Sequence, residues 1–516
     1  MDEKRHVTRA AGIIGLATLL SRVLGFVRDM IIAWFFGAGL LSDAFFVAFR
    51  IPNLLRRLFA EGTLSMAVVP VFTEQMTKYG KKEAFALARS AVRMLSLILV
   101  IVTLAGIAGA PWIVKIVAPG FAGSKFALTV TLTRIMFPYV ICICLMALCM
   151  GILNAMGHFT APALAPVFLN LTMIAAVVFI APYLETPVIG LAIGVLAGGV
   201  IQLLLQVPFL VRKGIVIWQK APLWHPALKK IGLLMGPAVF GAAVYQINIL
   251  VGTLLASLLP EGSVSYLYYA DRLVQFPLGI FAISTSIALL PSLSRQAAAK
   301  DYEALAETFA YSMNLIFFIT VPAMAGLIVL REPIIGLLFM RGAFGLESMQ
   351  LTAYALFHYS VGLWAFSGVR ILVSTFYALQ DTKTPVKMAT YSIIANIAFG
   401  VILMGPLSHG GLALATSLGS MINFFLLAAV LQKRMGGLHW KKIVVSIART
   451  VICSIIMGIV LLWWHRMFPP DYTGSIQFLL ANVFTAVLAG IIVYTACAMI
   501  FQRSELKSFI SMVKRN

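Results

Sequence analysis

Long apolar runs, separated by short polar segments, cover almost the whole chain. A helix needs about 20 apolar residues to cross a bilayer. Fourteen stretches of this kind are centred near residues 20, 52, 102, 140, 172, 200, 245, 280, 318, 362, 395, 420, 455 and 488. The longest polar segments have the length of linkers or surface helices. The pattern therefore predicts an all-α polytopic membrane protein with about 14 transmembrane helices and no separate soluble domain.

Two short segments of the first half recur in the second half. Residues 65–70 (SMAVVP) resemble residues 286–291 (SIALLP), and residues 155–162 resemble residues 378–385 at nearly the same spacing. Two matches at one spacing predict an internal duplication. The repeated unit holds six spans, so both copies enter the membrane in the same direction, which predicts a parallel repeat with a cavity between the halves.

The duplication divides the chain into three parts. We expect an N-terminal six-helix bundle over residues 1–215, a C-terminal six-helix bundle over 225–437, and an extra two-helix tail over 438–516. The tail fits oligomerisation, regulation or a lipid-facing groove, and the sequence alone does not choose among these roles.

Composition and charge agree with a membrane protein. The chain is 61% hydrophobic and 11% charged, with a formal net charge of +21. Basic residues concentrate in alternate polar segments, as the positive-inside rule requires of cytoplasmic loops. The intervening segments hold only Lys115, Lys125, Arg331, Arg341 and Arg466. This asymmetry predicts that both termini are cytoplasmic, and it accounts for the positive charge without nucleic-acid binding.

Charged residues interrupt the first two apolar stretches. They are Arg22, Arg28, Asp29, Asp43, Arg50, Arg56, Arg57 and Glu61. A charged side chain at the bilayer centre costs about 2.5–3.5 kcal/mol, so such a cluster is expected to line a polar cavity. Arginines outnumber acids, and a guanidinium group binds two phosphate oxygens at once. The cavity should therefore bind an anionic ligand.

Helical spacing groups several of these charges. Arg22 and Asp29 are seven residues apart and share one helix face, with Arg28 close to that face. In the second half, Asp271 and Arg272 are adjacent on one apolar stretch. Arg22, Arg28 and Arg272 are thus candidate substrate-binding residues, and Asp29 and Asp271 are candidates for a supporting role.

The second stretch offers further candidates with open alternatives. Asn53 neighbours Arg56 and Arg57 at helical spacing, and Arg57 can pair with Glu61 four residues on. We assign Asn53 and Arg56 to substrate binding, with Arg57 and Glu61 either supporting them or forming a structural pair. Asp43 follows a short turn, so it is either a functional acid or the N-cap of a helix.

Other classes of function find little support. The sequence contains no HExxH, P-loop, dinucleotide-binding or GxSxG motif, and the seven histidines are scattered. We therefore predict no enzyme, no cofactor and no metal site. A multidrug cation antiporter should have an acid-rich cavity, which the arginine surplus disfavours. A membrane scaffold that transports nothing gives no reason for buried arginines.

Several motifs resemble those of one family. They are residues 21–29 (SRVLGFVRD), 43–46 (DAFF), 52–57 (PNLLRR), 59–62 (FAEG), 268–273 (YYADRL) and 382–387 (TKTPVK). With these motifs the chain resembles the MurJ (MviN) lipid II flippase family of the multidrug/oligosaccharidyl-lipid/polysaccharide exporter superfamily. The resemblance covers essentially the whole chain.

The resemblance implies a transporter of the bacterial inner membrane. Such a protein moves lipid II, the undecaprenyl-diphosphate-linked peptidoglycan precursor, from the inner to the outer leaflet by alternating access. By similarity, the central-cavity arginines are Arg22, Arg28, Arg56 and Arg272, with Asp43 a further functional acid. The last two helices would hold the polyprenyl tail. The implied partners are lipid II, membrane lipids and cell-wall synthesis enzymes, and the alternative is a flippase for another polyprenyl-linked glycan.

The chain departs from the family pattern at two places. Some relatives have an acid where Gln275 stands. A sodium site of some members uses acids in helices 7, 11 and 12, whereas the corresponding stretches here contain none and the nearest acid is Asp381. Sodium coupling is therefore left open, with the membrane potential acting on the cationic cavity as the other candidate driving force.

Overall fold

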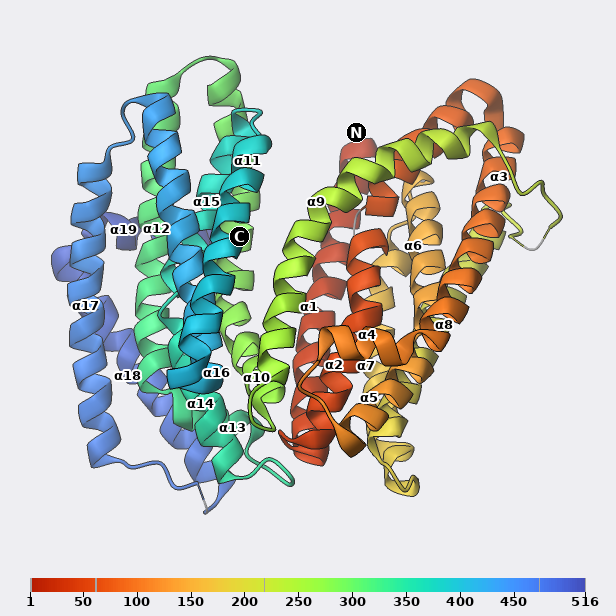
Figure 1. Ribbon diagram of the computed structural model, residues 1–516. Helices are drawn as coiled ribbons and strands as arrows, with labels where there is room; N and C mark the ends of the chain where they lie inside the picture. Colours follow the sequence, from red (N-terminus) through yellow and green to blue (C-terminus); the bar gives the residue numbers. More distant parts are fainter. Residues whose placement is uncertain (1, 61–62, 218, 473, 516) are drawn as a thin grey trace. The chain divides into compact units, whose positions relative to one another are not determined.

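The computed structural model describes residues 2–60, 63–217, 219–472 and 474–515, and these ranges contain helices and turns but no strand. The chain forms two compact units, Met1–Gly262 and Ser263–Asn516 (Figure 1). This division differs from the boundaries inferred from the repeat, because the helix Pro226–Ser257 packs within the first unit. The repeat-based boundaries stay a prediction.

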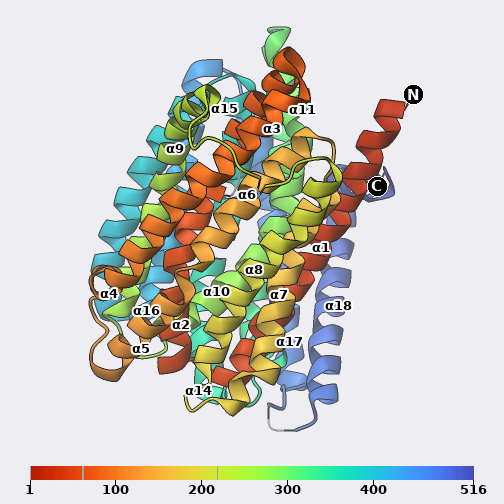
Figure 2. The ribbon, with the colours of Figure 1, turned by 90° about the vertical axis from the view of Figure 1, so that its right-hand side faces the viewer.

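The first unit consists of nine α-helices within its described residues. They are α1 (Asp2–Phe36), α2 (Leu40–Leu55), α3 (Thr63–Ala108), α4 (Ala110–Val117), α5 (Gly123–Met136), α6 (Tyr139–Ala155), α7 (Thr160–Phe179), α8 (Val188–Arg212) and α9 (Pro226–Ser257). Helix α7 packs against both α1 and α8, and these helices are visible together in Figure 2. Helix α3 packs on α6 and α9.

The second unit is also helical. Its helices are α10 (Ser263–Pro277), α11 (Ile283–Ala298), α12 (Tyr302–Val329), α13 (Arg331–Phe339), α14 (Leu346–Ser360), α15 (Leu363–Ala378), α16 (Lys383–Met435), α17 (Trp440–Met467), α18 (Ile476–Phe501) and α19 (Arg503–Arg515). The C-terminal pair joins this unit through α17, which packs on α12 (Figure 1). The Tyr494 hydroxyl in α18 donates to the Phe318 carbonyl at 2.7 Å.

Most of the long helices have the length and hydropathy of membrane-spanning segments. Nine helices within the described ranges are long and apolar enough to cross a membrane, and the bent pair α14–α15 makes a tenth. The all-α membrane class is thus confirmed. The count of 14 spans stays a prediction. The stretches near residues 395 and 420 lie on either side of a kink at Ser408 (φ +48°) within α16.

Two π-helical turns interrupt helices next to prolines. The first, Arg56–Ala60, follows α2 with Pro52 in its last turn, and the second, Leu278–Ala282, follows Pro277 at the end of α10. Proline removes a backbone donor, which favours such local rearrangement. The two turns are separated by nearly the spacing of the repeated sequence, which agrees with the predicted duplication. The first turn carries two of the candidate arginines.

Candidate functional site

A buried polar cluster joins α1 to α7 inside the first unit. The Arg28 side chain donates to Asp29 Oδ1 through Nη2 at 2.7 Å and through Nε at 3.0 Å. Its Nη1 atom donates to Asn170 Oδ1 at 3.0 Å. Arg28 is 7% exposed and Asp29 is 1% exposed. The two predicted charges therefore neutralise each other in a buried, hydrogen-bonded pair.

Asn170 is the residue of this cluster that sequence reasoning missed. It lies on α7, and its Nδ2 donates to the Ser21 carbonyl of α1 at 3.0 Å. Gly25 of α1 faces the Asn170 amide, where even a Cβ atom would make only ordinary van der Waals contact. The available signal was a single amide in the segment 161–179, whose only other polar side chain is Thr172.

Arg22 lies in a different environment from Asp29, although the two are on one helix face. Arg22 is exposed in its unit, whereas Arg28 and Asp29 are buried against α7. Asn170 of α7 contacts both the Arg28 side chain and the Ser21 carbonyl, whereas the side chain of Arg22 stays exposed. Of the two candidate binding arginines on α1, Arg22 is therefore the one whose side chain is exposed in its unit.

The end of α2 and the following π-helical turn bring three other candidates together. Asn53, Arg56 and Arg57 are all half-buried. The Asn53 Oδ1 atom is covered and accepts no hydrogen bond from the described part of the chain. Glu61 lies outside the described residues, so its pairing with Arg57 stays a prediction. Two guanidinium groups and an amide within one turn form a short donor-rich surface.

Arg50 serves to connect helices. Its Nη1 atom donates to the Thr253 hydroxyl and, at 3.4 Å, to the Ile249 carbonyl, both on α9. These contacts hold α2 against α9. Arg50 was not assigned to the ligand, and its contacts agree with a structural role.

Asp43 is the centre of a second buried cluster. Its Oδ2 atom accepts a hydrogen bond from Lys125 Nζ of α5 at 2.7 Å and another from the Gly262 amide at 2.8 Å. The Asp43 side chain is 1% exposed. Lys125 also lies over the Phe121 ring, 4.2 Å from its centroid. Asp43 therefore fastens α2 to α5 and to the last residue of the first unit.

The alternative that Asp43 caps α2 is wrong. The helix begins at Leu40 with Gly39 as its N-cap, so Asp43 lies within the first turn. The exposed Leu40 amide donates instead to Glu261 Oε1 at 2.8 Å. A carboxylate distant in sequence thus supplies the cap, which the local pattern could not reveal.

In the second unit, Asp271 and Arg272 lie half-buried on α10, and Gln275 is exposed. Arg272 Nη2 donates to the Tyr268 hydroxyl at 2.8 Å, and its guanidinium carbon lies 4.9 Å from the centroid of the same ring. The neighbouring Tyr269 is fully buried against Phe339 and Phe344. Tyr268 was not identified from the sequence, and its contact fixes the direction of the Arg272 side chain.

Asp381, the acid that the sequence places nearest to the stretches expected to hold a sodium site, makes several protein contacts. It accepts hydrogen bonds from the Thr384 amide at 3.0 Å, the Lys383 amide at 3.1 Å and the Thr384 hydroxyl at 2.7 Å, and it pairs with Arg434 at 2.7 Å. The Thr384 amide hydrogen bond, together with the hydroxyl and Arg434, lowers the pKa of Asp381. The carboxylate thus caps α16 and joins its two ends.

We expect Asp381→Ala to lower the free energy of unfolding by about 1–2 kcal/mol, the usual cost of removing a helix cap. The wild-type carboxylate has a lowered pKa in the folded state, so its contribution is present above the pKa of an unfolded aspartate, about 3.9. It is lost as the pH falls through the folded-state value. Unfolding of both proteins measured between pH 7 and pH 3 should show their difference shrinking on acidification, and a constant difference would contradict this account.

The candidate charged residues fall into two groups, those in buried contacts between helices and those that are exposed or half-buried. Arg28 and Asp43 are committed to buried contacts that hold helices together. Arg22, Arg56, Arg57 and Arg272 are exposed or half-buried in their own units. Guanidinium groups bind phosphate oxygens at any physiological pH because they do not deprotonate. These four side chains are therefore the ones best placed to bind an anionic group.

A family model and the relatives of this chain all indicate the same protein family. The family model described as "Lipid II flippase MurJ" matches residues 32–485. The "Probable lipid II flippase MurJ" of Vibrio cholerae is 40% identical over 469 residues, which cover 89% of each chain. The "Lipid II flippase MurJ" of Burkholderia cenocepacia is 40% identical over 423 residues, covering 81% of this chain and 82% of the relative.

Solved structures with a similar fold include two of interest. A structure titled "Lipid II flippase MurJ, inward closed conformation" has a TM-score of 0.80 at 28% identity, covering 96% of this chain and 99% of that one. An inward-facing multidrug resistance transporter of the MATE family has a TM-score of 0.70 at 17% identity, covering 81% and 95%. At this identity the second likeness shows the fold alone.

Proposed function

Because this chain belongs to the MurJ family of lipid II flippases, we propose that it moves lipid II from the inner to the outer leaflet of the bacterial inner membrane. The observation that carries the proposal is the identity of 40% to a relative named as such a flippase, over 89% of both chains. Membership of a transporter family also favours transport over catalysis.

We further propose that arginines of both units bind the diphosphate during alternating access. The support comes from four arginines in membrane-embedded stretches that are exposed or half-buried in their own units, namely Arg22, Arg56, Arg57 and Arg272. A diphosphate offers several oxygens, which suits paired guanidinium groups. With both termini in the cytoplasm, as the basic residues predict, the proposed starting state binds the headgroup from the inner leaflet.

The proposal is tested by replacement of a host's own flippase. A bacterium depleted of its lipid II flippase stops building its wall, and expression of this chain should restore growth. Rescue would support lipid II as the substrate. Failure to rescue at a normal membrane level of the protein would contradict it and would favour another polyprenyl-linked glycan.

The Arg272→Ala variant should fail in the same rescue while remaining folded. Hydrogen bonds to charged groups are worth about 1.5–3 kcal/mol, so losing one arginine–phosphate contact should weaken substrate binding by at least about tenfold. Tyr268→Phe removes only the hydroxyl that accepts from Arg272, and it should give partial rescue. The measurement is the growth rate at matched protein levels, and full rescue by Arg272→Ala would remove this residue from the proposed site.

A further inference from the structure

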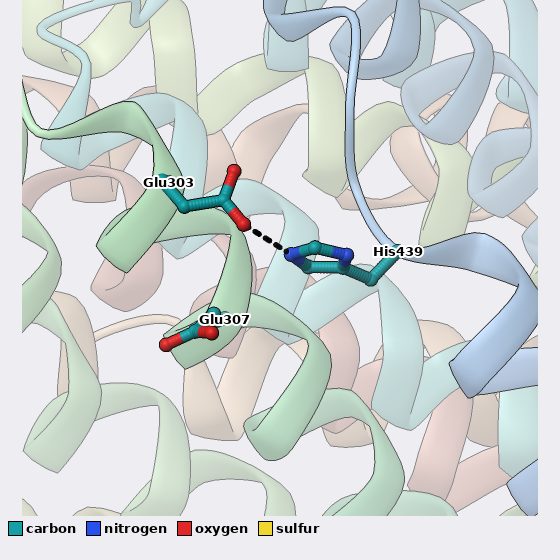
Figure 3. Close-up of side chains that lie close together, drawn as sticks. All are labelled: Glu303, Glu307 and His439. Carbon is teal, nitrogen blue, oxygen red and sulfur yellow. Dashed lines mark ion pairs between the residues drawn. The ribbon is translucent and has the colours of Figure 1, made fainter.

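Three potential metal ligands lie close together in the second unit, at the start of α12 and α17. Glu303 and Glu307 are one helical turn apart on α12, and His439 is the N-cap residue of α17 (Figure 3). One ligand atom from each residue lies within 4.8 Å of the others. The sequence predicted no metal site because His439 is distant from both glutamates along the chain.

The contact between His439 and Glu303 has the spacing of co-ligands. Nε2 of His439 lies 3.0 Å from Glu303 Oε1. The same nitrogen is covered from solvent and makes no properly aligned hydrogen bond to any side chain or backbone group that the structure describes. Two ligands of a tetrahedral ion with bonds of 2.0–2.2 Å lie about 3.3 Å apart without a proton between them. The pair therefore fits ligands of one ion better than a hydrogen bond.

Acidic side chains gather at the start of α12. Glu303 and Glu307 lie in its first two turns, and Asp301 precedes the helix and caps it, accepting from the Ala304 amide at 3.0 Å. Asp301 and Glu303 are close enough to the N-terminus of α12 to be stabilised by the helix dipole. Glu307, in the second turn, adds a carboxylate beside the imidazole.

We propose that Glu303, Glu307 and His439 form a site for a divalent transition-metal ion. One imidazole nitrogen and two carboxylate oxygens make a ligand set that Zn²⁺ accepts, with water in the fourth position. Both glutamates are exposed and His439 is half-buried, so the site lies at the surface of the second unit. The bound ion bridges α12 and α17 and thereby strengthens the attachment of the C-terminal helix pair to the rest of the second unit.

The direct test is metal titration of the full-length protein. The protein is purified in detergent without a polyhistidine tag, stripped with a chelator and titrated with ZnCl₂ in a calorimeter. Co²⁺, whose visible absorption reports tetrahedral coordination, serves as the second probe. We expect saturation at one ion per chain. Changes in partners that only orient ligands weaken metal binding by about 10–100-fold, so Glu307→Gln and His439→Gln, which remove a ligand, should each weaken it at least tenfold.

A matched control is available in the first unit. His225 Nε2 also lies 3.0 Å from a carboxylate oxygen, that of Glu83, but no third ligand residue accompanies this pair among the described residues. Glu83→Gln should therefore leave Zn²⁺ binding unchanged. A loss of binding in this control equal to that in Glu307→Gln would overturn the assignment.

Thermal unfolding separates metal binding from damage to the fold. Glu307 is exposed, so Glu307→Gln should unfold at the wild-type temperature when no metal is present. Zn²⁺ should raise the unfolding temperature of the wild type and not that of the variant, since only the wild type binds the ion in its folded state. Absence of saturable binding to the wild type, or equal binding by Glu307→Gln and His439→Gln, would overturn the proposal. The proposed lipid II transport does not depend on this outcome.

Discussion

Replacing Arg28 with alanine should abolish flipping and lower the free energy of unfolding by about 3–5 kcal/mol. Breaking a buried ion pair by removing one partner has a cost of this size, because the other charge remains buried. Here the Asp29 carboxylate, 1% exposed, would lose both of its hydrogen bonds from Arg28, and Asn170 Oδ1 would lose its donor. The measurements are the unfolding temperature in detergent and the outer-leaflet accessibility of lipid II in cells.

A double variant separates the structural role of Arg28 from a ligand-binding role. Arg28→Met combined with Asp29→Leu removes both charges, and replacing a buried pair by apolar side chains of similar volume is often neutral. The double variant should therefore recover most of the lost stability. If Arg28 contacts the diphosphate, flipping stays lost. If flipping returns with stability, Arg28 acts only by holding α1 against α7.

Replacing Asp43 with alanine should have a comparably large effect on stability. The change leaves the ammonium group of Lys125, which is 14% exposed, and the buried Gly262 amide without their acceptor. We expect the free energy of unfolding to fall by about 3–5 kcal/mol, as for other broken buried pairs. Flipping should fall with it, because the end of the first unit is no longer fastened to α2. Chemical denaturation monitored by tryptophan fluorescence measures the first effect.

Two further variants show whether the ion pair with Lys125 or the hydrogen bond from Gly262 contributes more to the stability that Asp43 provides. Asp43→Asn keeps an oxygen that can accept from the Gly262 amide and removes only the charge. Lys125→Met removes the ammonium group while keeping the length of the side chain. If the ion pair dominates, the double variant Asp43→Asn with Lys125→Met should be more stable than Asp43→Asn alone. Equal stability of the two would show that the Gly262 hydrogen bond dominates.

The sequence predicted the helical class well and the helix boundaries less well. Apolar runs of about 20 residues predict helices, because a helix that crosses the bilayer makes all of its backbone hydrogen bonds within the segment. The break at Ser408 within α16 and the bend between α14 and α15 depend on how neighbouring helices pack, so the pattern alone placed centres near them without their geometry.

The charges were found from the sequence, but their partners were not. Helical spacing compares residues within one helix, and it placed Arg22, Arg28 and Asp29 near one face of α1, where the structure exposes Arg22 and buries the other two. It carries no information about α7, whose Asn170 binds Arg28 and which buries only part of that face. Likewise, the sequence left Asp43 as either a functional acid or a local cap, whereas its partners Lys125 and Gly262 come from distant segments.

Contacts at the ends of helices bear on the predicted duplication. In the second unit, Arg434 at the end of α16 pairs with Asp381, which precedes that helix. In the first unit, Lys213 after α8 donates to the Met156 carbonyl, just before α7, at 3.4 Å. The two basic residues and the two turns occupy matching places in the repeated sequence. These contacts support the duplication inferred from short motifs.

The central claim is that this chain moves lipid II and that an arginine of its second unit takes part. The most direct measurement is the fraction of lipid II accessible at the outer face of cells depleted of their own flippase. We predict that the wild-type chain restores this fraction and that Arg272→Ala, at the same membrane level, does not. The absence of restoration by the wild type, or full restoration by Arg272→Ala, would contradict the claim.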